Sequence, residues 1–351
     1  MIGVVYLALI NPLSVEADEN NLEIFIRVET MTDAADLLRF DGQVALITGS
    51  GRGLGREYAL MLASRGCKIM VNDVNHADAD TTVADIHALG SGAAASYASV
   101  ENGEAIVSET LAAFGRLDIL VNNAGILTPE TWAELPAASW QKTLDVNLTG
   151  VFSVTRAAWP VLVKAKYGRV ILVASPAVFG AGVAAYAASK AALLGLGASL
   201  QFEARKLRLP QLRINTIIPF ADTRMTRDFA QQVDEKRAQQ GKKPAPSPPA
   251  QLMAVMGASK VAAMVAWLAH RDCEAQATIH EAGAGFFSQL RWARSAPLFV
   301  TAKEGVMGAP QPEHIRAGLA TLADFDNGDV APMGDGSMGG PNPVARVLSH
   351  L

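Results

Sequence analysis

A tyrosine and a lysine four residues apart are the most informative side chains of this sequence. Tyr186 and Lys190 stand in the run Tyr-Ala-Ala-Ser-Lys, and residues at this spacing are neighbours on a helix surface. A phenol with a pKa of about 10 is a poor base at neutral pH, but a nearby positive charge lowers that pKa and stabilises the phenolate. The pair can therefore take a proton from an alcohol or donate one to a carbonyl. Taken alone, a solvated surface pair is the simpler interpretation.

A glycine-rich turn earlier in the chain changes that balance. The segment 48–55 reads Thr-Gly-Ser-Gly-Arg-Gly-Leu-Gly, after an apolar run and before a helical pattern. Glycine lets the backbone approach a pyrophosphate, and a helix N-terminus favours its negative charge. A glycine turn followed by Tyr-x-x-x-Lys suits an enzyme that binds a dinucleotide and moves a proton together with a hydride. We expect the cofactor to contact Gly49, Ser50, Arg52, Gly53, Leu54 and Gly55.

Asp73 bears on the choice of cofactor. It ends the second predicted strand, about twenty residues beyond the glycine turn, where a carboxylate accepts the adenosine ribose 2′-hydroxyl and repels a 2′-phosphate. This position favours NAD over NADP. A solvated acid at the end of a strand is the alternative.

Short apolar runs alternate with helical patterns between residues 43 and 285. The runs 44–48, 68–72, 93–97, 119–122, 170–174, 214–218 and 277–280 predict strands buried on both faces. Helical patterns cover 56–64, 79–89, 104–114, 138–165, 184–207 and 260–269. This alternation predicts an α/β fold with a doubly wound parallel sheet of seven strands, and ligands then bind at the carboxyl ends of the strands.

The rest of the chain is less informative. We expect a single domain over residues 41–300, an N-terminal extension at 1–40 that is disordered or reflects a wrongly assigned start, and an appendage at 301–351. The apolar run 1–10 is too short to span a bilayer, and no basic region precedes it. A net charge of −4 argues against a nucleic-acid surface, and two cysteines are too few for a disulfide framework, which favours a cytoplasmic protein. The six histidines show no metal-ligand spacing, so we expect no metal. Because the apolar run is too short, we also expect no membrane partner.

The charged, Gln-rich and Pro-rich stretch 224–259 interrupts the alternation of strands and helices. Its composition cannot bury much apolar surface. It follows the sixth predicted strand, at the substrate end of the sheet. We expect it to form a substrate lid that is mobile over residues 226–255.

The sequence resembles the short-chain dehydrogenase/reductase family from about residue 41 to 328. The resemblance rests on the glycine turn, Asn122-Asn123-Ala124-Gly125, Asn147, Ser175, Tyr186 and Lys190. Within the family it is most similar to the (3R)-hydroxyacyl-CoA dehydrogenase unit of peroxisomal multifunctional enzyme type 2, through the segments 71–73, 168–171, 219–226, 283–285 and 290–292. The resemblance implies a Rossmann fold, an NAD(P)-dependent interconversion of a secondary alcohol and a ketone, and a homodimer or homotetramer.

The resemblance also implies roles for single residues. Ser175 would bond the substrate oxygen, Asn147 would hold a water that leads to Lys190, and Tyr186 would be the acid/base; Asn123, Ala124, Gly125, Pro219 and Thr223 would contact the cofactor. Three positions depart from the family pattern. Ser175 lies eleven residues before the tyrosine rather than the usual thirteen, Phe220 replaces a common glycine, and Ala98 replaces an acid. Arg52 is of a type that often accompanies NADP.

Two functions from different classes are consistent with this sequence. The first is an NAD-dependent oxidoreductase acting on a 3-hydroxyacyl-CoA or a steroid-like substrate. The second is a non-catalytic, NAD-bound scaffold or regulator of the same fold. A scaffold has no reason to keep Asn147, Ser175, Tyr186 and Lys190 together, which favours the enzyme.

Overall fold

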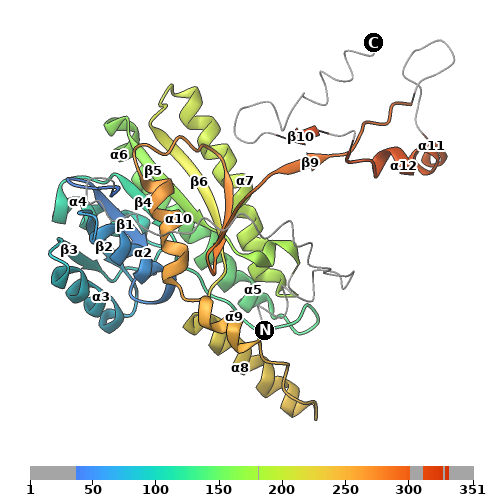
Figure 1. Ribbon diagram of the computed structural model, residues 1–351, viewed down its shortest axis with the longest axis horizontal. Helices are drawn as coiled ribbons and strands as arrows, with labels where there is room; N and C mark the ends of the chain where they lie inside the picture. The colour runs from blue at the N-terminus through green and yellow to red at the C-terminus, as the bar shows by residue number, and fades with distance from the viewer. Residues whose placement is uncertain (1–36, 181, 301–310, 327–328, 332–351) are drawn as a thin grey trace.

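The structure is a computed structural model that describes residues 37–180, 182–300, 311–326 and 329–331. The expectations for residues 1–36, and for most of the appendage at 301–351, lie outside the described residues. The described chain forms a layered α/β body from which two segments project (Figure 1).

One sheet forms the centre of the body, with strands in the order β3-β2-β1-β4-β5-β6-β7-β8 (Figure 1). Its strands are β1 (Val44–Thr48), β2 (Lys68–Asn72), β3 (Ala93–Ser96), β4 (Ile119–Asn122), β5 (Gly168–Val173), β6 (Leu212–Pro219), β7 (Ile279–Gly283) and β8 (Phe286–Leu290). The first seven are mutually parallel, so the predicted doubly wound parallel sheet is confirmed. The strand order changes direction between β1 and β4, which is where ligands bind in such sheets.

The structure adds an eighth strand, β8, to the seven that the sequence predicts. β8 pairs antiparallel with β7, and Gly283 lies opposite Phe286. The two residues between the strands, Ala284 and Gly285, both have positive φ, at 52° and 86°, as in the tight turns that join hairpin strands. β8 was missed because it is a half-exposed edge strand and not a buried apolar run.

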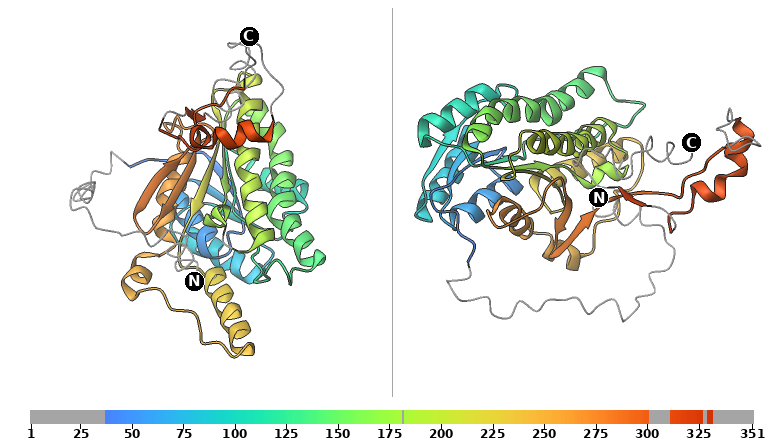
Figure 2. Two further views of the ribbon diagram at one scale, coloured as in Figure 1. Left: turned by 90° about the vertical axis from the view of Figure 1, so that its right-hand side faces the viewer. Right: turned by 90° about the horizontal axis from the view of Figure 1, so that it is seen from above.

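Two hydrophobic clusters lie on opposite faces of the sheet. Along β1, Ala45 and Ile47 pack into one cluster and Leu46 into the other, as side-chain alternation along a strand requires. The first cluster contacts α2 (Gly53–Ala63), α3 (His76–Ala88) and α10 (Ser259–Ala269); the second contacts α4 (Gly103–Phe114), α6 (Gly150–Ala165) and α7 (Ala184–Lys206). Helices therefore cover both faces (Figure 2).

The predicted helix at 138–165 consists of three consecutive parts. They are α5 (Ala137–Leu144), a π-helical turn (Asp145–Thr149) and α6. This run is long and apolar enough to cross a bilayer, but Val151, Val154, Ala158 and Leu162 pack against the sheet, so it is a core helix here. The π-helical turn was not predicted, and such turns are frequent at functional sites.

Two segments project from the body. The expected lid region contains α8 (Arg224–Gln239) and α9 (Ala250–Val255), and neither helix has a fully buried residue, consistent with its charged composition. The second segment contains β9 (Trp292–Arg294), α11 (Pro312–Ala317), α12 (Leu319–Leu322) and β10 (Asp329–Ala331), with β9 and β10 paired antiparallel (Figure 1).

Candidate active site

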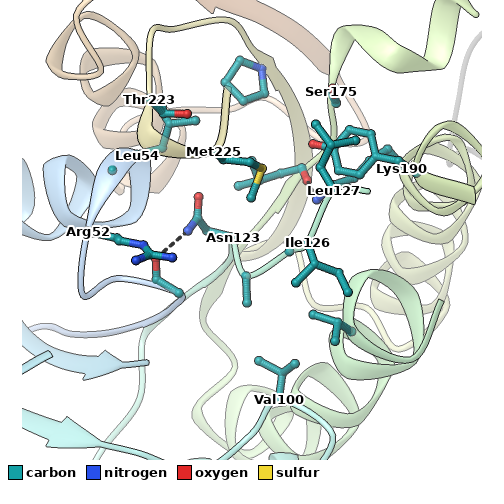
Figure 3. A pocket seen from close by; sticks show the side chains of 18 of the residues that line it. Arg52, Leu54, Val100, Asn123, Ile126, Leu127, Ser175, Lys190, Thr223 and Met225 are labelled. Carbon is teal, nitrogen blue, oxygen red and sulfur yellow. Dashed lines mark hydrogen bonds between the residues drawn. The ribbon is translucent and has the colours of Figure 1, made fainter. Parts of the chain in front are cut away.

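A cavity of about 420 Å³ opens at the carboxyl ends of the central strands (Figure 3). Each strand end contributes to its wall: the glycine turn follows β1, Asp73 follows β2, and Asn123 follows β4. Ser175 follows β5, and Pro219 ends β6. The sheet therefore brings together residues that are up to 170 positions apart in the sequence.

The turn after β1 has the form of a phosphate cradle. Gly49 and Gly53 have φ of 61° and 57°, a region that favours glycine. A Cβ on Gly49 would lie 2.8 Å from the Ala124 Cα, and one on Gly55 would lie 2.6 Å from the Asn123 Nδ2. No side chain caps the N-terminus of α2, so its first N–H groups remain available to an anion. The turn thus fits a pyrophosphate.

Two predicted cofactor residues of this turn do not border the cavity. The Ser50 hydroxyl donates to the Ile47 carbonyl at 2.7 Å, and Ser50 is buried. Gly55 packs beneath Gly49. Arg52, Gly53 and Leu54 do line the cavity. Ser50 and Gly55 therefore shape the turn from behind.

Asn123 fastens the glycine turn to the end of β4. Its Nδ2 donates to the carbonyls of Thr48 and Gly49, at 3.0 and 2.9 Å. The backbone N–H groups of Asn123 and Ala124 both donate to the Thr48 hydroxyl at 3.0 Å. The Asn123 amide protons are thus used within the protein, which holds the cradle in one shape.

Asp73 is held at the cofactor end of the cavity. Its Oδ2 accepts the Gly51 N–H and its Oδ1 accepts the Asn75 N–H, both at 3.0 Å. The Arg52 guanidinium lies 3.3 Å from Asp78 on α3, in an ion pair that is partly exposed. The charge of Arg52 is therefore partly offset, while the Asp73 carboxylate borders the cavity. This arrangement suits a ribose 2′-hydroxyl better than a 2′-phosphate.

Tyr186 and Ser175 meet at the other end of the cavity, where Figure 3 shows Ser175 beside Lys190. Burial raises the pKa of Tyr186, whereas the sequence predicted a lowered value, and a hydrogen bond from Ser175 acts in the opposite direction. The Ser175 hydroxyl also accepts the Ala177 N–H at 3.2 Å and so caps the 3-10 turn Pro176–Phe179. Ser175 is therefore both a structural cap and a neighbour of the phenol.

Lys190 is buried behind Tyr186. Its Nζ donates to the Val173 carbonyl at 2.8 Å and lies 5.7 Å from the centroid of the Tyr186 ring. Burial lowers the pKa of Lys190 to about 8, so the ammonium is protonated at neutral pH. Gly125 leaves room for this group, since a Cβ there would lie 3.3 Å from the Lys190 Nζ and 3.2 Å from the Asn147 Oδ1.

Asn147 lies in the π-helical turn and does not line the cavity. Its Oδ1 accepts the Ile126 N–H at 2.8 Å, and its Nδ2 donates to the Ile126 carbonyl at 3.0 Å. The same Nδ2 lies 3.1 Å from the Ser189 hydroxyl, which donates to the Tyr186 carbonyl at 2.7 Å. Asn147 therefore ties the loop after β4 to the helix that carries Tyr186 and Lys190.

The wall on the lid side comes from the segment after β6. Pro219, Thr223 and Met225 line the cavity, and Figure 3 shows Met225 between the Ser175–Lys190 side and the Arg52–Asn123 side. Thr223 and Thr226 cap α8 reciprocally through their hydroxyl and N–H groups. The lid helix thus begins at the cavity wall.

Sequence reasoning missed several apolar residues of the wall, namely Val74, Val100, Ile126, Leu127 and Met225. Each of them lies two to six residues after the end of a strand that the sequence did identify, so their position in the chain was the available signal. Among the described residues, no group of His, Cys, Asp and Glu side chains could hold a metal ion.

Comparisons with known proteins agree with this geometry. The family model for short chain dehydrogenase matches residues 43–234. The chain is 37% identical over 328 residues to mouse peroxisomal multifunctional enzyme type 2, covering 90% of this chain but 41% of the mouse protein. It is 38% identical to a 3-oxoacyl-[acyl-carrier-protein] reductase of Synechocystis, over 53% of this chain and 77% of the reductase. The chain therefore spans less than half of the mouse relative.

Solved structures show the same fold. Full-length peroxisomal multifunctional enzyme type 2 of Drosophila melanogaster superposes with a TM-score of 0.70 at 28% identity, over 89% of this chain and 51% of that one. A short chain dehydrogenase of Mycobacterium paratuberculosis bound to NAD superposes with a TM-score of 0.61 at 25% identity, over 70% of this chain and 98% of that one.

Proposed function

The chain belongs to the short-chain dehydrogenase family and is therefore an oxidoreductase with a nicotinamide cofactor, and we propose that it interconverts the 3-hydroxyl and 3-keto groups of an acyl thioester with NAD. The observation that carries the reaction is that Tyr186, Ser175 and Lys190 line the same cavity as the glycine cradle, with the Lys190 Nζ 5.7 Å from the centroid of the Tyr186 ring. The name of the Synechocystis relative, a 3-oxoacyl-[acyl-carrier-protein] reductase, supports the acyl thioester.

The preference for NAD rests on Asp73. Its carboxylate borders the cavity next to the glycine turn, where it can accept a ribose hydroxyl and repel a phosphate. Asp78 holds Arg52, the residue that would favour NADP. The NAD-bound neighbour supports the same cofactor.

The chain's own residues handle the proton. Bound NAD would supply the hydride acceptor for oxidation of the carbinol carbon, and NADH would supply the hydride for reduction. Tyr186 takes the proton of the alcohol hydroxyl in oxidation and donates it to the carbonyl in reduction. Ser175 holds the reacting oxygen against the phenol, and Lys190 stabilises the phenolate by its positive charge. Asn147 acts as a positioning residue, because its bonds reach the site only through Ile126 and Ser189.

The rival reading, a cofactor-bound scaffold without catalysis, is tested with Tyr186→Phe. The variant keeps the half-buried ring but loses the phenol proton, so we expect unchanged NAD affinity and a loss of at least ~10²-fold in turnover. The assay follows NADH formation from a 3-hydroxyacyl thioester. Wild-type turnover in the variant, or no turnover of any secondary alcohol by the wild type, would contradict the proposed function.

A second copy of the chain is the proposed partner. The outward face of α7 carries Ala188, Ala191, Gly195 and Ser199, which are exposed and small, and small residues permit close helix packing. Gly197 of the same helix is buried and faces the Thr216 hydroxyl of β6. A homodimer or homotetramer at micromolar concentration in light scattering would support this proposal, and a monomer would refute it.

The lid and the compartment also remain proposals. We propose that residues 224–259 close over the substrate, since Arg224, Met225 and Thr226 already line the cavity. The mouse relative is named as peroxisomal, so a peroxisomal location stands beside the cytoplasmic one expected from the sequence. Imaging of the full chain with a fluorescent tag in a yeast cell would separate the two.

A further inference from the structure

The residue after Pro219 is left unexplained by the proposed function. Phe220 stands where the family pattern commonly has glycine. Phe220 is half-buried and lines the cavity together with Ser175 and Tyr186. A ring at this position occupies volume that glycine would leave open to a substrate.

The Phe220 backbone is close to the reacting centre because of the sheet register. β5 and β6 are neighbours, and Val173 pairs with Ile217, so Ser175 is level with Pro219. Adjacent strands lie about 4.8 Å apart. Since Ser175 and Tyr186 hold the reacting oxygen, Phe220 lies beside a substituent of the reacting carbon.

Gly283 at the end of β7 makes the place for this ring. The Phe220 N–H donates to the Ala282 carbonyl at 3.0 Å. A Cβ on Gly283 would lie 2.5 Å from the Phe220 Cδ2 and 2.7 Å from its Cε2. Any other residue at 283 would therefore clash with both the carbonyl oxygen and the ring of Phe220.

Phe286 on β8 supports the ring from outside the cavity. The two ring centroids are 6.0 Å apart, and the rings are tilted by 48°. The tight turn at Ala284 and Gly285 brings Phe286 opposite Gly283. Phe286 is 52% exposed and does not line the cavity, so it can affect a substrate only through Phe220.

We propose that Phe220 is a specificity-determining residue, which narrows the cleft beside the reacting carbon so that an unbranched acyl chain enters and a fused-ring alcohol or ketone does not. Gly283 and Phe286 position the ring. The inference rests on the proposed function, and it separates the two substrate classes that the sequence left open.

The experiment compares two ketones with NADH, an unbranched 3-oxoacyl thioester of N-acetylcysteamine and the fused-ring ketone 2-decalone. The measured quantity is the ratio of kcat/KM for decalone to that for the thioester. We expect the wild type to prefer the thioester and Phe220→Gly to raise the ratio by ~10-fold or more, since pocket changes of a methylene or more have effects of about 10- to 200-fold. NADH affinity, measured separately, reports on cofactor binding.

Variants on β8 test the positioning role. Phe286→Ala should raise the ratio in the same direction, and Phe286→Tyr should restore it. Phe287→Ala is the matched control, because Phe287 is a neighbouring aromatic residue, 46% exposed, that points to the opposite face of the sheet. We expect no change of the ratio in this control.

Each outcome decides the inference. An unchanged ratio in folded Phe220→Gly, or a wild type that prefers decalone, refutes it while leaving the oxidoreductase function intact. A wild type that reduces neither ketone refutes the proposed function and the inference with it. If Phe220→Gly does not fold, Phe220→Leu replaces it, with a smaller rise expected and an unchanged ratio again refuting the role of Phe220.

Discussion

Replacing Lys190 by methionine should make the cofactor-free protein more stable at neutral pH while abolishing its activity. Lys190 is 3% exposed, and burial lowers its pKa to about 8 from an ordinary value of 10.5. The folded state therefore disfavours the ammonium relative to the unfolded chain. Methionine has a similar length, carries no charge, and packs readily in irregular apolar sites.

The magnitude follows from the difference between the two pKa values. One pKa unit corresponds to about 1.4 kcal/mol, so the protonated lysine costs roughly 3 kcal/mol at pH 7. The variant also loses the bond from Nζ to the Val173 carbonyl, which contributes about 1 kcal/mol. We therefore expect Lys190→Met to raise the free energy of unfolding by about 2 kcal/mol at pH 7.

The sign of the pH dependence is fixed by the lowered pKa of Lys190 in the folded state. Between pH 8 and 10.5 the unfolded chain binds more protons than the folded one, so wild-type stability rises with pH in this window. The advantage of the variant should therefore disappear near pH 10, where the cost of the lysine falls to about 1 kcal/mol.

Urea unfolding of both proteins at pH 7 and pH 10, without cofactor, measures these differences. Lys260→Met on the same protein is a useful control, since Lys260 is exposed and should give little change at either pH. A variant that is less stable than the wild type at pH 7, or an advantage that does not change with pH, would refute the reasoning.

Two further predictions concern cofactor choice and the lid. Asp73→Ala should weaken NAD binding by about 10- to 100-fold, the range for a hydrogen bond to a charged group, and narrow the preference over NADP in calorimetry; a wild type that binds NADP more tightly would show that Arg52 is the better guide. Lys236→Ala should raise KM for a long acyl thioester by about two- to fivefold, because the Lys236–Glu134 ion pair joins the lid helix to the loop after β4 and is partly exposed. Lys242→Ala at the tip of the lid is the control, and equal effects of the two variants would argue against a specific contact.

The sequence determined the fold class and most of the site because both depend on local order along the chain. Each apolar run became a strand of the parallel sheet, although β3 at the edge is only partly buried, and the residues after the runs reached the same edge. Asp73, Ser175 and Pro219 therefore line one cavity, as their positions after three strands of the sequence predicted. The Tyr186–Lys190 pair was identified for the same reason, since both residues lie on one helix.

The tertiary structure decided what each of these side chains contacts. The sequence predicted all of these residues to lie at the site, but only some of them line the cavity. Arg52 lines it, whereas Ser50 and Asn147 form hydrogen bonds with backbone groups behind the cavity wall. The burial that lowers the pKa of Lys190 comes from packing and from no local pattern. The edge strand β8 pairs with β7 through a tight turn, and this pairing brings Phe286 against Phe220. Both contacts form only when the rest of the sheet is in place. The order of residues along the chain determines which side chains reach the site. Contacts between distant segments determine their protonation, their orientation and the space around them.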